Sequence, residues 1–193
     1  MSNHLIIDNA VPTDTFKAIQ QDLLHDQFDW YFRKGIQHAG DNNSQFIHPF
    51  HINGLIATSK EKFNCVFPIL DILKPEAICR IKANLTHRTV ETLETGLHID
   101  IMIPGALTAI FYVNTTNGYT YFSDGTKVKS IENRLLIFPS CTPHAGATCT
   151  DEHRRVVINF NYMPSLNNDI WQKIKTPKDQ QYQELWEDRA EGY

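Results

Sequence analysis

The sequence predicts an α+β fold in which helices come first and a run of antiparallel strands follows. Two amphipathic segments precede Pro75, and from Ile78 onward the chain is rich in β-branched and aromatic residues. The turn dipeptides Asn117-Gly118 and Asp124-Gly125 divide this second part into short strands. Helices followed by a meander of strands favour a β-sandwich or barrel that carries helices on one face.

The chain of 193 residues is long enough for one sizeable core, so we expect a single domain over residues 1–193. Within it we expect a helical support over 1–77, a strand-rich core over 78–162 and a helical tail over 163–193. These divisions follow the change in composition at Ile78 and the charged character of the tail.

The composition, with 41% hydrophobic and 21% charged residues, is that of a soluble globular protein. A net charge of −4 argues against nucleic-acid binding, and no apolar run is long enough to cross a membrane. Four cysteines without a recognisable secretion signal indicate reduced thiols and a cytoplasmic location. The sequence leaves the oligomeric state open.

Three segments before the core have a clear pattern. Leu5–Ile7 has the composition of a short strand. Residues 14–24 place apolar side chains three or four positions apart, as in an amphipathic helix, and residues 63–73 indicate a second helix. The polar residues 36–60 between them are expected to form a long connection that contributes to binding.

Two further segments have no clear periodicity. The aromatic residues at 28–32 are expected to pack in the core, and the alternative is that they form a wall of a substrate cleft. The tail from Pro164 has few apolar anchors among many charges, so we expect one or two short helices that dock on the core.

Five segments of the second part are expected to be strands because of their β-branched and aromatic residues. These segments are residues 79–85, 107–114, 119–123, 134–138 and 156–160.

A metal site is predicted at His98 and Asp100, which stand two positions apart in the expected strand 97–103. Residues i and i+2 of a strand point to the same side, so both side chains can bind one ion. His144, on a different strand, supplies a second imidazole. Two histidines and one carboxylate leave open coordination positions, which favours Fe(II) with oxygen and a co-substrate at those positions.

The His-x-Asp triplet alone is weak evidence. In a chain of this length with nine histidines, roughly one such triplet is expected by chance, and one occurs. The prediction therefore depends on the residues around it.

The strand after the second histidine supplies a candidate anion-binding side chain. Alternation puts Arg155, Val157, Asn159 and Asn161 on one side and apolar residues on the other. The polar side is expected to face a wet cavity, with Arg155 and Asn159 as candidate cofactor-binding residues. An inward arginine binds a carboxylate through charge-assisted hydrogen bonds, which contribute roughly 1.5–3 kcal/mol each.

Two other residues are candidates for the same carboxylate. Arg154 would point inward in place of Arg155 if the pleat of the strand were reversed. The hydroxyl of Tyr112 could donate a hydrogen bond to the carboxylate, but a tyrosine that only packs within a strand is an equal alternative.

Five segments in this order resemble the prolyl-4-hydroxylase-like branch of the 2-oxoglutarate- and Fe(II)-dependent dioxygenases. They are Thr108–Asn114, Gly118–Phe122, Asn133–Pro139, Pro143–Gly146 and Arg155–Phe160. The resemblance covers about residues 78–162. Residues 28–32 and 80–85 are similar to a subgroup that is common in phages and marine microbes.

The resemblance implies a double-stranded β-helix, also called a jelly-roll or cupin-like core. It implies that His98, Asp100 and His144 are the catalytic iron ligands, and that Arg155, helped by Tyr112, binds the distal carboxylate of 2-oxoglutarate. The implied reaction uses Fe(II), 2-oxoglutarate and O2, with ascorbate as a candidate reductant, and releases succinate and CO2.

The hydroxylated substrate of such an enzyme would be a peptidyl residue, such as proline, or a small molecule. Many prolyl hydroxylases carry lysine at the position of Arg155, which weakens the case for proline as the substrate.

Two other functions would also use part of this residue set. A cupin-like metal-binding protein without 2-oxoglutarate chemistry also uses histidines and a carboxylate, but it needs no inward arginine. A zinc-binding module is suggested by Cys141, His144, Cys149 and His153, although their spacing matches no standard zinc knuckle.

Overall fold

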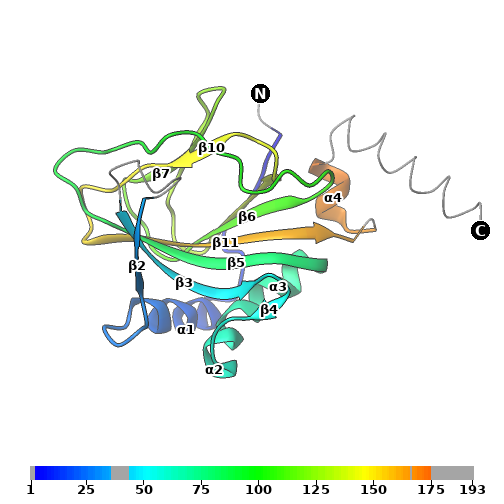
Figure 1. Ribbon diagram of the computed structural model, residues 1–193, viewed down its shortest axis with the longest axis horizontal. Coiled ribbons are helices and arrows are strands. Elements are labelled where there is room, and N and C mark those ends of the chain that lie inside the picture. The colour runs from blue at the N-terminus through cyan, green and yellow to red at the C-terminus, as the bar shows by residue number, and fades with distance from the viewer. Residues whose placement is uncertain (1–2, 36–43, 166, 175–193) are drawn as a thin grey trace, which may run out of the picture.

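The computed structural model describes residues 3–35, 44–165 and 167–174 as two facing antiparallel sheets with helices on the outer face of the larger one (Figure 1). The larger sheet runs in the order β1 (Leu5–Ile7), β9 (Arg134–Pro139), β6 (Leu107–Tyr112), β11 (Arg154–Pro164), β5 (Pro75–His87), β3 (Ser44–Ile52) and β2 (Tyr31–Lys34). β4 (Leu55–Ile56) pairs with β3 at its edge. The smaller sheet contains β10 (His144–Gly146), β7 (Tyr119–Phe122) and β8 (Lys127–Lys129).

The helices α1 (Thr13–Leu24), α2 (Lys60–Phe63) and α3 (Phe67–Leu73) lie below the larger sheet in Figure 1, whereas β7 and β10 lie above it. A 3-10 turn, Asn64–Val66, joins α2 to α3, and α4 (Asp169–Ile174) follows the last strand. Across the described residues, each helix is too short or too polar to span a membrane. This arrangement confirms the predicted double-stranded β-helix with supporting helices.

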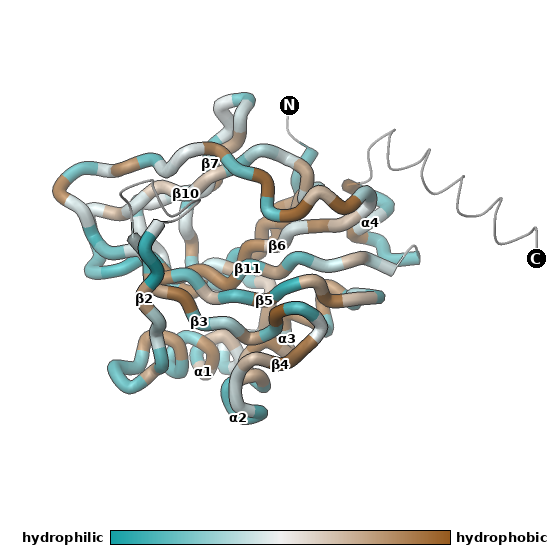
Figure 2. The backbone as a smooth tube through the Cα atoms, in the orientation of Figure 1, coloured by the Kyte–Doolittle hydropathy of each residue, from teal (hydrophilic) through white to brown (hydrophobic). Residues whose placement is uncertain are grey.

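The larger of two hydrophobic clusters fills the space between the sheet and the helices. On β11, Val156, Ile158 and Phe160 point into it and are almost completely buried. Phe16 and Ile19 of α1 face the same cluster. Because full burial of such a side chain contributes roughly 1.5–3 kcal/mol, this layer dominates the stability of the fold. Figure 2 shows the hydrophobic residues concentrated along β6 in the middle of the molecule.

Several expectations for the elements are confirmed. The strand at Leu5–Ile7, the first helix and the five strands of the second part all form, with longer bounds for β5 and β11 than expected. The second helix is interrupted near Pro68, where α3 begins a new run. In the tail, α4 buries Ile170, Trp171 and Ile174, whereas residues 175–193 lie outside the described residues.

The expectation of a long connection over residues 36–60 is wrong. Ser44–Ile52 forms a nine-residue strand in the larger sheet, next to β5, although residues 36–43 lie outside the described part. Pro49 hid this strand in the sequence, because proline lacks the N–H that a central strand donates. The structure accommodates it with a register shift between Pro49 and His51.

The aromatic residues at 28–32 divide into two that pack and two that are exposed. Phe28 and Trp30 pack against the core, as expected. Tyr31 and Phe32 lie on the edge strand β2 and are 54% and 64% exposed, so core packing was the wrong expectation for these two.

A buried histidine on β3 gives the fold a pH dependence. His48 is enclosed by Phe28 and Phe50, and its ring nitrogens lie 2.7 Å from the Asp29 carbonyl and 2.9 Å from Thr58 Oγ1. Burial lowers the pKa of His48, although the Asp29 carbonyl partly offsets this effect. The folded protein therefore binds fewer protons here than the unfolded chain just below pH 6.5.

We expect this histidine to destabilise the fold as the pH falls through its unfolded pKa of about 6.5. The difference in free energy of unfolding between the wild type and His48→Gln should therefore shrink between pH 7.5 and pH 5. Urea unfolding at both pH values measures it, with the exposed His25→Gln as the control. A difference that is the same at both pH values would contradict the neutral state of His48.

Candidate metal centre and cofactor cavity

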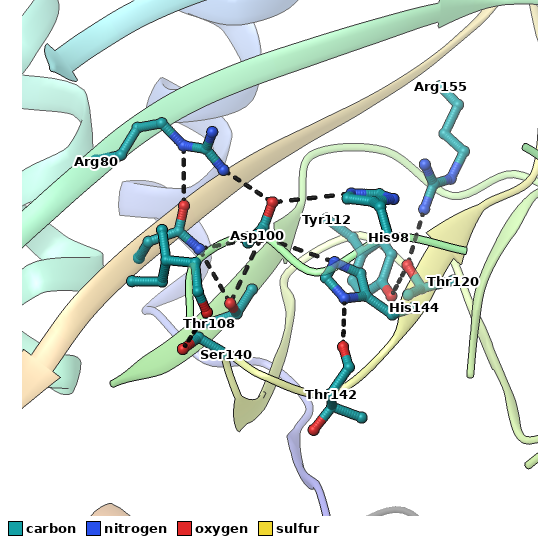
Figure 3. A network of polar contacts seen from close by, with 12 residues as sticks. Arg80, His98, Asp100, Thr108, Tyr112, Thr120, Ser140, Thr142, His144 and Arg155 are labelled. Atoms are coloured by element: carbon teal, nitrogen blue, oxygen red, sulfur yellow. Dashed lines mark hydrogen bonds and ion pairs between the residues drawn. The ribbon is translucent and has the colours of Figure 1, made fainter. Parts of the chain in front are cut away.

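His98, Asp100 and His144 converge on one point between the two sheets (Figure 3). His98 Nε2 lies 3.8 Å from Asp100 Oδ1, and His144 Nε2 lies 3.7 Å from Asp100 Oδ2. Their ligand atoms lie within 4.8 Å of one another. In the part of the chain that the structure describes, no other group of three or more histidine, cysteine or acidic side chains is so placed.

Pairing between the two histidines positions the site. The backbones of His98 and His144 exchange two hydrogen bonds, of 2.9 and 3.0 Å, in an isolated bridge. The expectation of a continuous strand over residues 97–103 is wrong, because pairing stops after this bridge and the chain continues irregularly to a turn at Pro104. Asp100 nevertheless points to the same side as His98, as predicted.

Hydrogen bonds around the ligands hold them in place. His144 Nδ1 lies 2.9 Å from the carbonyl oxygen of Thr142, so it carries the proton and leaves Nε2 with a lone pair toward Asp100. Asp100 accepts from Arg80 Nη2 at 2.8 Å and from Asn161 Nδ2 at 3.0 Å. These contacts fix the orientation of both side chains before any ion binds.

The electrostatics favour the protonation states that a metal requires. Burial raises the pKa of Asp100, but His144, Arg80 and the Asn161 hydrogen bond outweigh it, so the pKa lies below its usual value. Burial lowers the pKa of His144, and the attraction of Asp100 only partly offsets this effect. The site therefore presents a carboxylate and a neutral imidazole near neutral pH.

This donor set fits Fe(II). Two imidazoles and one carboxylate on one side of an ion leave the opposite coordination positions open. The second nitrogen of His98, Nδ1, is buried. Within the described structure this atom has no hydrogen-bond partner, so the described protein groups leave it unpaired.

A partly open cavity lies beside the three ligands. Its floor is β11, where Arg155, Val157 and Asn159 face the cavity, as the predicted alternation requires. Asn161, the next residue on the same face, reaches Asp100. One face of β11 therefore serves two parts of the site: Arg155 at one end faces the cavity, and Asn161 at the other end supports the metal ligand Asp100.

Arg155 is 5% exposed and uses only part of its hydrogen-bonding capacity. Its Nε donates to Ser130 Oγ at 2.6 Å and its Nη2 to Thr120 Oγ1 at 3.2 Å. A guanidinium has five N–H donors, and a hydrogen bond with Tyr112 uses one more, so at least two remain. Burial lowers the pKa of Arg155, and none of the ion pairs within the described residues involves it. A buried cation without a counter-ion is costly, and a bound carboxylate would remove that cost.

The other two candidates have different places. Arg154 points away from the cavity and donates to the carbonyl oxygen of Leu24, at the end of α1, so the correct pleat is the one with Arg155 inside. Tyr112 is fully buried below Arg155, with the guanidinium carbon 5.6 Å from its ring centroid. Its hydroxyl donates to Thr120 Oγ1 at 2.8 Å, and Tyr112 is not among the residues that line the cavity.

Sequence reasoning missed the functional residues on β5. Arg80, which pairs with Asp100, and Lys82, which lines the cavity, alternate with Ile81 and Ala83 of the core. The alternation of polar and apolar residues along this strand was the signal that could have found them.

The zinc alternative has no support in the geometry. Cys141 and His153 are exposed, and Cys149 is buried with its thiol donating to the carbonyl oxygen of Glu152. Within the described residues, the cysteines join no cluster of metal-ligand side chains.

No protein-family model and no curated protein matches the sequence. Solved structures match the fold at low sequence identity. The epimerase SnoN, in complex with Fe3+, α-ketoglutarate and nogalamycin RO, is 10% identical with a TM-score of 0.58, over 91% of this chain and 86% of that chain.

Two prolyl hydroxylases match as well. The Pseudomonas putida prolyl-4-hydroxylase is 12% identical with a TM-score of 0.56, over 84% of this chain and 94% of that chain. The Trichoplax adhaerens prolyl hydroxylase, in complex with a hypoxia-inducible-factor peptide, is 16% identical with a TM-score of 0.59, over 84% of each chain. The chain therefore has the double-stranded β-helix fold of 2-oxoglutarate- and Fe(II)-dependent oxygenases.

The hydrogen bond from Asn161 to Asp100 is expected to support metal binding. Asn161→Leu keeps the side-chain volume but removes this donor, together with the hydrogen bonds to Arg80 and Thr108. Loss of such support typically weakens metal affinity by about 10–100-fold. Titration with Mn(II), followed by calorimetry, measures the effect. Asn114→Ala is a matched control, because Asn114 also makes two hydrogen bonds to β11 but lies away from the metal ligands. Equal Mn(II) affinity in both folded variants would refute this role.

Gly118 makes room for Arg155. A Cβ atom at this position would lie 2.7 Å from Arg155 Cδ and 2.9 Å from the carbonyl oxygen of Ala147. We expect Gly118→Ala to lower the free energy of unfolding by about 1–3 kcal/mol, the usual cost of overpacking. Gly146→Ala should cost less, because its Cβ would lie 3.5 Å from Arg155 Nη1, an ordinary contact. Chemical denaturation compares the two, and equal losses would contradict the packing argument.

Proposed function

We propose that this protein is an Fe(II)- and 2-oxoglutarate-dependent dioxygenase that hydroxylates a substrate still to be identified. The observation that carries the proposal is the combination, in one cavity, of the three metal ligands with a buried arginine that has no counter-ion. A metal site alone would also fit the cupin-like alternative. The inward Arg155 has no purpose in that alternative.

The chain's own residues divide the work. His98, Asp100 and His144 would hold the ion, and the free donors of Arg155 would bind the distal carboxylate of 2-oxoglutarate. Tyr112 and Thr120 support the guanidinium from below. When bound, Fe(II) supplies the redox chemistry that couples the decarboxylation of 2-oxoglutarate by O2 to the hydroxylation, with succinate and CO2 as products.

Positioning and exclusion of water are what the protein adds to this chemistry. Val157 and Ile110 line the cavity between the metal ligands and Arg155 and provide an apolar floor for the carbon chain of 2-oxoglutarate. Tyr112 acts as a positioning residue, because its hydroxyl is occupied by Thr120.

The solved structures with this fold support 2-oxoglutarate and iron as cofactors. They differ among themselves in reaction and in substrate. SnoN contains Fe3+ and α-ketoglutarate and is an epimerase that carries nogalamycin RO, whereas the Trichoplax enzyme holds a peptide. For this chain, hydroxylation of a peptidyl residue or a small molecule remains the proposal.

The central test is binding of 2-oxoglutarate to the Mn(II)-loaded protein, measured by calorimetry. Arg155→Ala removes at least two charge-assisted hydrogen bonds, so we expect affinity to fall by about 100-fold or more. Arg154→Ala is the matched control and should bind as the wild type does, because Arg154 points to α1.

Succinate formation from 2-oxoglutarate with Fe(II), O2 and ascorbate should follow the same pattern in the two variants. Wild-type protein that binds Mn(II) but not 2-oxoglutarate would favour the cupin-like metal protein instead.

A further inference from the structure

β5 presents a row of polar side chains to the cavity. Lys82, Asn84 and Thr86 all line it, whereas the residues between them point into the hydrophobic core. Asn84 Oδ1 and Thr86 Oγ1 are buried without a hydrogen-bond partner within the described structure. Because unsatisfied buried polar atoms are costly, such a row indicates that a ligand completes it.

The row is separate from the proposed 2-oxoglutarate position. In the register of β5 with β11, Lys82 lies opposite Asn159 and Thr86 opposite Arg155. The Arg155 side chain, however, extends over Tyr112 of β6, on the other side of β11, and bonds to Thr120 and Ser130. The β5 side of the cavity therefore stays open beside the metal ligands.

Lys82 is a second cation without a counter-ion. Within the described residues it has no hydrogen-bond or ion-pair partner, and its side chain is mostly buried. Burial lowers the pKa of Lys82 to about 8, and the positive charges of Arg80 and Arg33 add to this effect, against the attraction of Asp100. Within the described part of the chain, the one carboxylate that acts on Lys82 is Asp100, which is already paired with Arg80.

The cationic character continues toward the edge of the sheet. Arg33 on β2 lies opposite Gln45 of β3, which lines the cavity, so its side chain stands on the same face of the sheet. Among the described residues that line the cavity, Asp100 is the one acidic side chain. A ligand that approaches along β2, β3 and β5 therefore meets positive charge and polar hydrogen-bonding groups.

We propose that the primary substrate carries an oxyanionic group, a carboxylate or a phosphate, and that Lys82 binds this group. Asn84 Oδ1, which can only accept, would take a hydrogen bond from a donor elsewhere on the same substrate, and the Thr86 hydroxyl would bond to a polar group further along the strand. The inference rests on the proposed function, because it assigns 2-oxoglutarate to Arg155 and leaves Lys82 for the substrate. Lys82 is thus a specificity-determining residue and not a ligand of the metal or of 2-oxoglutarate.

The test uses full-length protein loaded with Mn(II) and saturating 2-oxoglutarate, a form that does not turn over. Calorimetry compares N-acetylglycine with its neutral amide, and methyl phosphate with methanol, so that carboxylate and phosphate are separate arms. We expect at least one oxyanion to bind about 10-fold more tightly than its neutral partner, because only the oxyanion forms a charge-assisted hydrogen bond with Lys82. Lys82→Met should abolish this preference, Lys82→Arg should retain it, and the exposed Lys129→Met should leave it unchanged.

Three results would overturn the inference. These are equal binding of both oxyanions and their neutral partners, a preference that survives in Lys82→Met, and a loss of 2-oxoglutarate affinity in Lys82→Met comparable to that in Arg155→Ala. The last result would place Lys82 in the cofactor site. Failure of wild-type Mn(II)-loaded protein to bind 2-oxoglutarate would be seen before any oxyanion is added, and it would reject the proposed function itself.

Discussion

The register of β11 between β5 and β6 is the constraint on which the site depends. One face of this strand places Asn161 against Asp100 and, six residues earlier, Arg155 at the far end of the cavity. The other face is buried among the helices, so a shift of one residue would put the polar row into the core and the apolar row into the cavity. Packing against α1 and α3 therefore fixes the positions of the metal-supporting and anion-binding side chains at once.

The polar groups of the cavity lower the stability of the ligand-free protein, because several of them have no partner, and the same groups are available to bind ligands. Arg155 and Lys82 are cations in an enclosed space without counter-ions among the described residues, and two oxygen atoms on β5 lack partners. Only Asp100 is fully compensated, by Arg80 and Asn161, which hold it in position for a metal. In our proposal, this distribution of charge divides the cavity into three parts: a metal site, a 2-oxoglutarate carboxylate site at Arg155 and a second anion site at Lys82.

Much of this was accessible from the sequence, because local patterns determine it. The strands of the second part follow from composition, and alternation along one strand puts Arg155 and Asn159 on the same side. The choice between Arg155 and Arg154 as the inward arginine needed the structure, in which Arg154 bonds to Leu24. The β3 strand was not accessible, since Pro49 and its neighbours have no strand pattern and the pairing with β5 is between distant segments. Nor could the sequence show that Arg80 pairs with Asp100 or that Thr120 occupies the Tyr112 hydroxyl, because those contacts depend on how two sheets face each other.

A crystal structure of the protein with Mn(II) and 2-oxoglutarate tests the central claim most directly. The account predicts the metal on His98, Asp100 and His144, the distal carboxylate of 2-oxoglutarate on Arg155, and Lys82 free of both. A metal bound elsewhere, or a 2-oxoglutarate carboxylate held by Lys82 with Arg155 unoccupied, would contradict it.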